Sequence, residues 1–405
     1  MHEIILVNVT GADKPGLTRD ITRVLAAHGV DVMDIGLAVI HEHVSMALLI
    51  RVPQTEVSYQ VLKDLLFKAH ERNLNISFTP MTDEDYSSWV SKQTQTRHVI
   101  TMLARIISAQ HISRLTEIIL EQGLNIEKIN RISQRIPLNP GSEPTRACVE
   151  LNVIGSPKNG HTLRAELMFM AQELGVDVSL QADNMYRRNR RLVVFDMDST
   201  LIQQEAIDEL AIEAGVGDAV SAITEAAMRG ELDFRASFHK RLALLKGLPK
   251  EKVNAVAERI QLSEGAERLV TTLKRLGYKT AILSGGFSLF GEILQHRLGI
   301  DHVFANVLEF ENGSLSGRAV EPIVDGQRKA ELLKELAIRE GLDLQQVVAI
   351  GDGANDLPMI ELAGLGIAFR AKPLVKQRAD HAISVLGLDG VLYLMGIRDR
   401  ELTGL

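Results

Sequence analysis

Two stretches of the chain show the same order of hydrophobic and polar positions. In residues 21–35 (ITRVLAAHGVDVMDI) and 115–129 (LTEIILEQGLNIEKI), apolar residues recur at helical spacing up to a glycine and then alternate with polar residues. This order predicts an amphipathic helix that ends at Gly29 or Gly123 and is followed by a strand. The chain is therefore expected to contain an internal repeat.

Each copy of the repeat is expected to form a strand, a helix, two strands, a helix and a strand. In the first copy, strands are predicted near residues 3–9, 31–40, 44–52 and 74–79, and helices near 15–28 and 56–73. In the second copy, strands are predicted near 98–104, 124–133, 146–153 and 176–182, and helices near 111–122 and 160–174. Four strands with two helices on one face form a ferredoxin-like α+β domain, which we expect over residues 1–82 and 96–182.

Short, wholly apolar runs replace the alternation from residue 192 onward. They are typical of strands buried on both faces, and they occur at residues 192–195, 278–283, 347–350 and 365–369. Because helical patterns lie between them, we expect an α/β domain with a parallel, Rossmann-like sheet over residues 192–405.

Two segments interrupt this order. Residues 205–262 contain several helical patterns and no convincing strand, so a helical insertion after the first strand is expected over about that range. Residues 183–191 (DNMYRRNRR) are expected to form a solvated linker, and a nucleic-acid-binding patch is the alternative.

The composition narrows the class of protein. The 405 residues carry 45 basic and 52 acidic side chains, and the net charge of −7 argues against a general nucleic-acid binder. The single cysteine, Cys148, excludes an intramolecular disulfide and a cysteine metal cage. No apolar run approaches the roughly 18 residues of a membrane span and no secretory signal is recognisable, so a cytoplasmic protein without a membrane segment is expected.

Three of the predicted strands end in residues that can carry chemistry. The motifs are DMDST at 196–200, SGG at 284–286 and GDGAND at 351–356, and Lys329 lies between the last two. In a parallel sheet, ligands bind beyond the carboxyl ends of the strands. If these strands are neighbours, up to four carboxylates share one crevice, and their repulsion raises their pKa values or demands a cation. Because the cluster offers oxygen ligands without Cys or a nearby His, Mg²⁺ suits it better than Zn²⁺.

The same crevice is expected to bind a phosphoryl group. Exposed N–H groups at the start of a helix predicted over residues 287–298 form a seat for phosphate, and Lys329 can add a positive charge to it. Asp196 can then attack phosphorus to form an aspartyl phosphate, and Asp198 can protonate the leaving group and later activate water. A surface position for Lys329 and a plain surface loop for GDGAND are the alternatives.

A possible substrate clamp lies in the helical insertion. Phe234, Phe238, Arg241 and Leu245 fall on one helix face, so Arg241 interrupts an apolar stripe. Either Arg241 extends from the edge of a packing face to water, or it binds a substrate carboxylate from the underside of a cap. Glu205 could hold an ammonium group, although a Glu in a first helical turn also serves the helix dipole. O-phospho-L-serine is the simplest phosphomonoester with both groups.

These residues resemble a known family. DMDST, SGGF, the intervening lysine and GDGAND are similar to the four motifs of the haloacid dehalogenase superfamily of phosphohydrolases, and residues about 190–395 resemble its phosphoserine phosphatase family. The resemblance implies a parallel core with a helical cap, Mg²⁺ as cofactor, and hydrolysis of phosphoserine in the last step of serine biosynthesis. It implies substrate contacts from Glu205, Met228, Phe234, Arg241, Ser284, Gly285, Lys329 and Asn355. It implies metal binding by Asp196, Asp352 and the backbone carbonyl of Asp198, with Asp356 as a supporting residue.

The two repeats resemble ACT domains, which bind amino acids and regulate metabolic enzymes. The segment GADKPG (residues 11–16) joins the first strand to the first helix, with Asp13 expected to cap that helix and Pro15 to lie in its first turn. Asp13 and Gly16 are the candidate residues for binding an amino-acid carboxylate, with serine as the effector by feedback logic. The second repeat lacks the Pro-Gly at the corresponding position. ACT-like sheets often pair side by side, so a homodimer is expected.

Two other functions remain open at this point. The same core could act on another small phosphomonoester or transfer the phosphoryl group to an alcohol. Alternatively, the chain could be a non-catalytic amino-acid sensor built on a phosphatase scaffold, although its intact motifs favour an enzyme.

Overall fold

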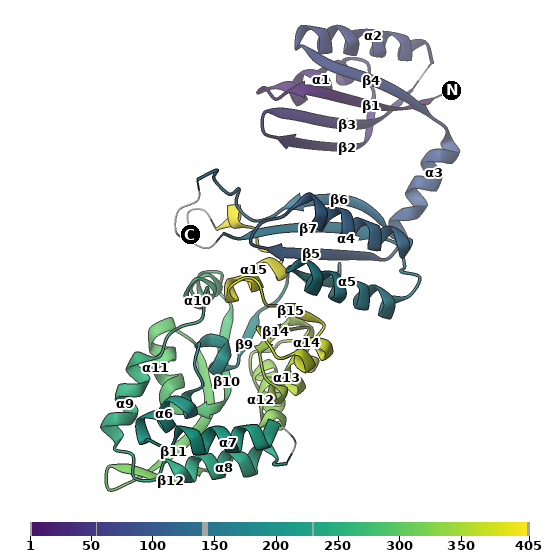
Figure 1. Cartoon of the computed structure of the whole chain (residues 1–405). Coiled ribbons are helices and arrows are strands. Elements are labelled where there is room, and N and C mark those ends of the chain that lie inside the picture. Colours follow the sequence, from purple (N-terminus) through teal and green to yellow (C-terminus); the bar gives the residue numbers. More distant parts are fainter. Residues whose placement is uncertain (1, 54, 140–144, 229–230, 403–405) are drawn as a thin grey trace. The chain divides into compact units, whose positions relative to one another are not determined.

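The computed structural model describes residues 2–53, 55–139, 145–228 and 231–402 (Figure 1). The chain divides into two compact units, Met1–Gln95 and Thr96–Leu405, which are described separately. Among the described residues, no helix is long and apolar enough to cross a membrane.

The first unit has the predicted ferredoxin-like order. Its elements are β1 (Glu3–Ala12), α1 (Leu17–Ala27), β2 (Asp31–Ile40), β3 (His43–Val52), α2 (Thr55–Glu71) and β4 (Leu74–Met81), followed by α3 (Asp83–Ser91). The strands pair antiparallel in the order β2-β3-β1-β4. One core joins alternate strand residues such as Val7 and Leu48 to helix residues such as Ile21 and Leu65. The strand and helix predictions are therefore confirmed, whereas α3 was not predicted.

The second unit begins with the second copy of the repeat. Its elements are β5 (Arg97–Ala104), α4 (Ala109–Glu121), β6 (Asn125–Arg131), β7 (Ala147–Ile154), α5 (Gly160–Leu174) and β8 (Asp177–Ala182). The sheet order is β6-β7-β5-β8, which matches that of the first copy. The internal repeat is thus confirmed.

The rest of the second unit is built on a seven-stranded sheet of order β12-β11-β10-β9-β13-β14-β15. The strands are β9 (Leu192–Phe195), β10 (Lys279–Phe287), β11 (His302–Glu311), β12 (Ser314–Val320), β13 (Val347–Gly351), β14 (Leu365–Phe369) and β15 (His381–Ile383). All neighbours pair in parallel except β11 and β12. The predicted parallel sheet is confirmed, whereas β11, β12 and β15 were not predicted.

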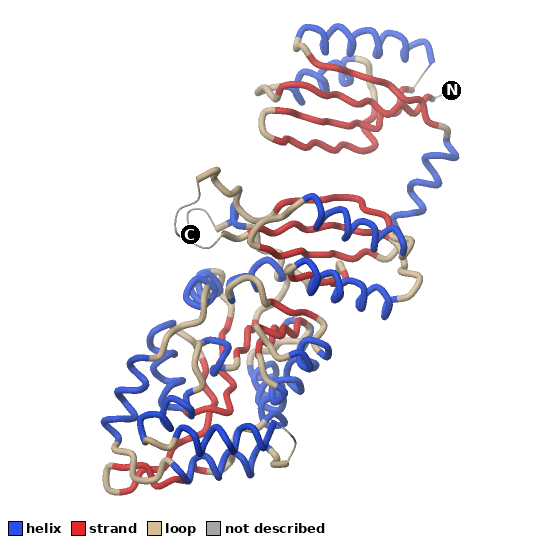
Figure 2. The backbone as a smooth tube through the Cα atoms, viewed as in Figure 1, coloured by secondary structure: helices blue, strands red, loops and turns tan. Residues whose placement is uncertain are grey.

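Helices cover both faces of this sheet (Figure 2). One core packs α10 (Ala266–Arg275) and α11 (Ser288–Leu298) against one face, and another packs α12 (Gly326–Arg339), α13 (Leu357–Leu362) and α14 (Pro373–Arg378) against the other. The chain ends beyond α15 (Val391–Leu394). The predicted insertion forms α6 (Ala206–Ala214), α7 (Gly217–Met228), α8 (Phe234–Leu244) and α9 (Lys250–Arg259), which we call the cap.

The arginine-rich segment 183–191 differs from the solvated linker that we expected. Arg187 and Arg190 are buried, with exposed fractions of 2% and 5%. Arg187 Nη2 donates to Glu150 Oε2 of β7 at 2.6 Å, and both side chains of this ion pair are buried. The expectation of a solvated segment is therefore wrong for these two residues, because the segment packs between the second repeat and the α/β part. The predicted domain boundaries themselves stay predictions.

Residues of the second repeat also share a hydrophobic core with the α/β part. Leu103, Ile132 and Cys148 belong to the same buried cluster as Tyr393 and Met395. Cys148 is fully buried in this core, and its thiol is free. This shared core explains why the two parts form one compact unit.

A buried histidine at this junction predicts a pH-dependent stability. His381 Nδ1 lies 2.9 Å from Ser179 Oγ of β8, and burial lowers the pKa of His381 from 6.5 to about 4. In the unfolded chain His381 takes up a proton as the pH falls through 6.5, whereas in the folded chain it does so only near pH 4. The contribution of neutral His381 to the free energy of unfolding is therefore present above pH 6.5 and is lost on acidification. Between pH 7.5 and 5 the loss should be about 2 kcal/mol of unfolding free energy.

The comparison of wild type with His381→Gln isolates this group from the other titrating residues. Urea unfolding should show that the difference in unfolding free energy between the wild type and the variant is about 2 kcal/mol smaller at pH 5 than at pH 7.5. An advantage that is equal at both pH values would mean that His381 is not the titrating group.

Candidate active site

The three motifs meet because their strands are neighbours in the sheet. β9 lies between β10 and β13, so that Phe195 is in register with both Ile282 and Ile350. The next residue, Asp196, donates its N–H to the Ile350 carbonyl oxygen at 2.8 Å, which ties the end of β9 to β13. The expected convergence of DMDST, SGG and GDGAND at one sheet edge is therefore confirmed.

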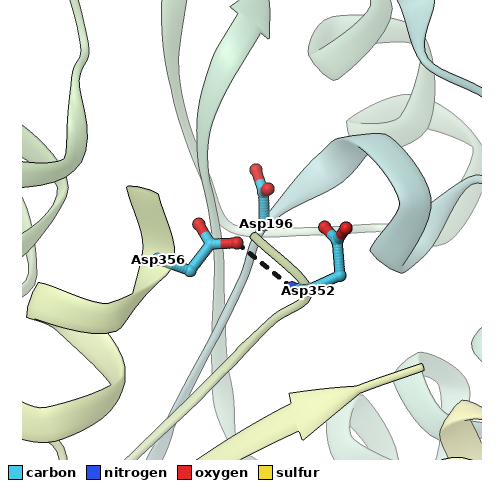
Figure 3. A group of neighbouring side chains, drawn as sticks. All are labelled: Asp196, Asp352 and Asp356. Atoms are coloured by element: carbon cyan, nitrogen blue, oxygen red, sulfur yellow. Dashed lines mark hydrogen bonds between the residues drawn. The ribbon is translucent and has the colours of Figure 1, made fainter. Parts of the chain in front are cut away.

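Three carboxylates gather at this edge (Figure 3). One oxygen from each of Asp196, Asp352 and Asp356 lies within 4.8 Å of the others. Burial raises the pKa of Asp196 well above its usual range, and the charge of Asp356 raises it further. Burial, followed by the charge of Asp356, raises the pKa of Asp352 to about 7. These three carboxylates carry more negative charge than the neighbouring side chains neutralise. A cluster that offers only oxygen ligands fits a hard dication.

Lys329 is the cation of this cluster. It lies in the first turn of α12 with an exposed fraction of 0%, so the alternative of a surface lysine is wrong. Its Nζ is 2.8 Å from Asp196 Oδ1 and 2.6 Å from Asp356 Oδ1. Burial lowers the pKa of Lys329, but the charges of Asp196 and Asp356 outweigh this effect and raise the pKa above its usual value. The ammonium group therefore stays charged.

Asp356 shapes the loop that carries Asp352. Its Oδ2 accepts the N–H groups of Asp352, at 3.1 Å, and Gly353, at 2.9 Å, while its Oδ1 binds Lys329. Gly351 is required here, because a methyl group on it would lie 2.4 Å from the Asp356 Cγ. Since both oxygens of Asp356 are engaged, its position suits the supporting role expected from the sequence.

Asp198 stands apart from the cluster of three carboxylates. Its Oδ1 accepts the Ala206 N–H at the start of α6 (2.8 Å), and its Oδ2 lies 3.5 Å from the Ser284 Oγ. A methyl group on Gly286 would lie 2.3 Å from Oδ2, so SGG leaves space for this carboxylate. Burial, followed by the charge of Glu205, raises the pKa of Asp198 to about 7. Both protonation states are therefore populated near neutral pH, which suits a group that gives up and takes up a proton.

The underside of α8 packs over the second motif. A methyl group on Gly285 would lie 3.0 Å from the Phe234 Cζ, so this ring covers the glycine. Phe234 stacks on Phe238 with ring centroids 6.1 Å apart, and Phe238 lies 6.0 Å from the ring of Phe287 at the end of β10. The predicted apolar stripe of α8 is thus confirmed as a buried face.

Arg241 lies on this underside without a partner. Its Nε is buried and has no hydrogen-bond partner, and no ion pair of its guanidinium is found among the described residues. Burial lowers the pKa of Arg241, while the charges of Asp208, Glu205 and Asp198 act to raise it. A desolvated guanidinium is costly unless an anion binds it. This geometry favours a ligand clamp over an arginine that extends to water.

The remaining predicted site residues have different surroundings. Glu205 is exposed, precedes α6, and accepts a 2.8 Å hydrogen bond from the Ser199 hydroxyl. Asn355 is half-buried, and its carbonyl oxygen would lie 2.6 Å from a methyl group on Gly326, so its backbone packs against the start of α12. Met228 ends α7, and its side chain lies outside the described part of the structure.

Sequence reasoning missed Asn306, which supports the second motif. It is buried in β11, donates from Nδ2 to the Gly285 carbonyl oxygen at 2.8 Å, and accepts the Val324 N–H at 2.8 Å. The available signal was an asparagine within the apolar run VFANVLEF. Ser199 was missed too; its φ of +54° turns the chain after Asp198.

The loop GADKPG of the first unit differs from the expected helix cap. Helix α1 begins at Leu17 after Gly16, which has a φ of +88°, and no side chain caps the helix. Asp13 is exposed, and its N–H donates to the Glu42 carbonyl oxygen at 2.7 Å. The expectation that Asp13 caps α1 is therefore wrong, because glycine provides the left-handed turn that starts this helix.

Comparison with known proteins supports the same division of the chain. Residues 193–361 match the haloacid dehalogenase-like hydrolase family, and residues 3–79 and 96–181 match ACT domains. A phosphoserine phosphatase of Streptomyces coelicolor is 40% identical over 98% of this chain and 93% of its own length. One of Mycobacterium tuberculosis is 39% identical over 98% of this chain and 94% of its own length. The solved structure of a haloacid dehalogenase family hydrolase from Salmonella enterica aligns with a TM-score of 0.64 and 32% identity, covering 73% of this chain and 98% of that one.

Proposed function

The chain belongs to the phosphoserine phosphatases of the haloacid dehalogenase-like hydrolases, and on this premise we propose that it hydrolyses O-phospho-L-serine to L-serine and phosphate through an aspartyl phosphate. The observation that carries the substrate assignment is Arg241, a half-buried guanidinium without a partner among the described residues, on the cap face above the second motif. A substrate carboxylate would complete its coordination, and Glu205 supplies a negative charge for the ammonium group.

The first step of the proposed reaction uses Asp196 as nucleophile. Its Oδ1 is held by the Met197 N–H at 2.8 Å and by Lys329, whereas its Oδ2 has no hydrogen-bond partner among the described residues and is free to attack phosphorus. As the bond from Asp196 to phosphorus forms, the bond from phosphorus to the serine oxygen breaks. Asp198, which is partly protonated near neutral pH, donates its proton to that oxygen.

The second step releases phosphate. Asp198, now a carboxylate, takes a proton from water, and the resulting hydroxide oxygen bonds to phosphorus while the bond to Asp196 breaks. Lys329 and the N–H groups at the start of α11 offset the charge on the phosphoryl oxygens. Mg²⁺, which we propose is held by Asp196, Asp352 and the Asp198 carbonyl with Asp356 in support, would supply further positive charge to those oxygens.

A panel of phosphomonoesters tests this assignment. With Mg²⁺ present, phosphate release should be about 100-fold more efficient in kcat/KM for O-phospho-L-serine than for O-phosphoethanolamine, which lacks the carboxylate. Equal efficiency would favour a general phosphatase. Phosphate transfer to added alcohols in preference to water would favour a phosphotransferase, and no turnover of any compound would favour a non-catalytic sensor.

We further propose that serine regulates the enzyme through the loop of Asp13 and Gly16 in the first ACT domain, with two chains pairing through their ACT domains. Added serine should change the rate of phosphoserine hydrolysis in the wild type, and Asp13→Ala should remove this response without changing the rate in its absence. Gln110→Ala, in the first turn of α4 at the corresponding point of the second ACT domain, is the matched control. A response that survives in Asp13→Ala, or that is lost equally in Gln110→Ala, would place the effector elsewhere.

A further inference from the structure

The cap is joined to the core by two chain segments that lie side by side. Residues 201–205 lead into the cap and residues 260–265 lead back, and we call them together the cap hinge. The Gln203 N–H donates to the Gln261 carbonyl oxygen at 3.0 Å, and the Ser263 N–H donates to the Leu201 carbonyl oxygen at 2.9 Å. Any movement of the cap over the site must bend these segments.

The second ACT domain reaches the returning segment of the hinge through Arg105. This residue follows β5, and its guanidinium binds the Glu264 carboxylate in a bidentate manner, with Nη1 2.8 Å from Oε1 and Nη2 2.9 Å from Oε2. On the other side, Arg370 of the core donates to Oε2 at 2.6 Å. Hydrogen bonding from Arg105 lowers the pKa of Glu264 despite some burial. Paired, charge-assisted bonds of this kind fix orientation better than a single contact.

A second contact from the ACT domain holds Asp389, which packs against the next hinge residue, Gly265. Arg146, just before β7, donates from Nη1 to the Asp389 Oδ2 at 3.0 Å. Asp389 is buried and also accepts from Arg268 of α10 at 2.7 Å. It lies directly against the hinge, because a methyl group on Gly265 would be 2.3 Å from the Asp389 Oδ1. Arg105 thus binds the hinge residue Glu264 directly, whereas Arg146 reaches Gly265 only through Asp389.

The cap hinge borders a cleft on the side where Arg146 lies. A cleft of 710 Å³ is lined by residues of both hinge segments, including Gln203 and Leu262, and by Arg146. The hinge therefore has room to bend, and the Arg105–Glu264 ion pair ties it directly to the second ACT domain.

We propose that Arg105 and Arg146 are positioning residues of the cap, through which the second ACT domain sets the geometry of the hinge and hence of Arg241 above the substrate. The kinetic part of this inference rests on the proposed function, whereas the restraint on the hinge does not. Neither arginine reaches the reacting atoms. Replacing either arginine should therefore lower kcat/KM for a substrate that contacts the cap and leave kcat/KM unchanged for a substrate that does not.

Arg105→Gln in the full chain tests the proposal. We expect kcat/KM for O-phospho-L-serine to fall about 10-fold, because a displaced clamp loses orientation. For p-nitrophenyl phosphate, which has neither carboxylate nor ammonium group, the change should stay below about 2-fold. Glu264→Gln should lower it at least as much, because this change also removes the charge that Arg370 binds, and the double variant should be no worse than Glu264→Gln alone.

Arg164→Gln is the matched control. Arg164 also joins the second ACT domain to the α/β part, through an exposed ion pair with Asp380, but neither residue belongs to the hinge. Its removal should leave both activities unchanged. Equal losses in Arg105→Gln and Arg164→Gln, or equal losses for both substrates, would overturn the proposal.

Hydrogen exchange gives a readout that does not depend on activity. Arg105→Gln should speed the exchange of the Gln203 and Ser263 amide protons about 10-fold, whereas Arg164→Gln should not. If the wild type released no phosphate from phosphoserine, the proposed function would fail, and this measurement would still decide whether the ACT domain restrains the hinge. Unchanged exchange in Arg105→Gln would refute the restraint itself.

Discussion

Replacing Asp196 by Asn should reduce phosphate release from O-phospho-L-serine by about 10⁴-fold or more, the range seen when a covalent nucleophile is lost. The carboxylate oxygen that we assign to the attack, Oδ2, becomes part of an amide that is not nucleophilic. The fold should survive, because Lys329 keeps its 2.6 Å contact with Asp356 Oδ1 and one of three crowded acids loses its charge. Steady-state phosphate release and the far-ultraviolet circular dichroism spectrum are the two measurements.

Asp218→Asn provides the control for the loss of one negative charge. Asp218 is exposed in the first turn of α7, and this variant should keep the wild-type rate. Activity of Asp196→Asn within about 10-fold of the wild type would rule out Asp196 as the nucleophile, whatever the control shows.

Arg241→Ala should lower kcat/KM for O-phospho-L-serine by about 100-fold, the magnitude of a lost charge-assisted bidentate contact. The same variant should hydrolyse O-phosphoethanolamine as well as the wild type does, since that compound has no carboxylate for the guanidinium. The selectivity between the two substrates should therefore disappear. Because the Arg241 Nε lacks a protein partner among the described residues, its removal should not destabilise the fold through a broken ion pair.

Lys240→Ala is the matched control for this variant. Lys240 is the preceding residue of α8 and is exposed, so its removal takes away one positive charge of the cap without touching the underside. It should keep both the rate and the selectivity. Retained selectivity in Arg241→Ala would show that another group recognises the carboxylate.

The sequence predicted those parts of the site for which the local hydrophobic pattern and the sheet topology indicate the same position. The apolar run Leu192–Phe195 could hardly be anything other than a buried strand, and a parallel sheet brings strand ends together. The positions of Asp196 and Asp352 followed from these two facts. Arg241 was identifiable because a charged residue interrupted an apolar helix face, a conflict that often marks a site.

Other features depended on contacts between distant segments, which a local pattern does not contain. Arg187 looked like a residue of a solvated linker, yet it is buried against Glu150, and its partner lies in a different element. Asn306 gave little signal, because its role depends on the backbone of Gly285 and Val324. The strands β11 and β12 were equally hidden, since β11 is mostly half-buried and neither strand alternates regularly between buried and exposed positions.

The start of α1 shows a different kind of failure. Asp13 has a side chain suited to a helix cap, and Pro15 suits a first turn, so the sequence favoured an early start. The helix begins instead after Gly16, whose positive φ is easily adopted by glycine. Side-chain preference and backbone preference competed within a few residues, and the backbone preference of glycine decided the boundary.

The most direct test of the account follows phosphate release from O-phospho-L-serine as the divalent cation is removed and restored. The crowded acids Asp196 and Asp352 should need that cation to hold a phosphoryl group. We predict turnover with Mg²⁺, a loss of at least about 100-fold after chelation with EDTA, and recovery when Mg²⁺ is added back. Absence of turnover with Mg²⁺, or turnover that chelation leaves unchanged, would contradict the account.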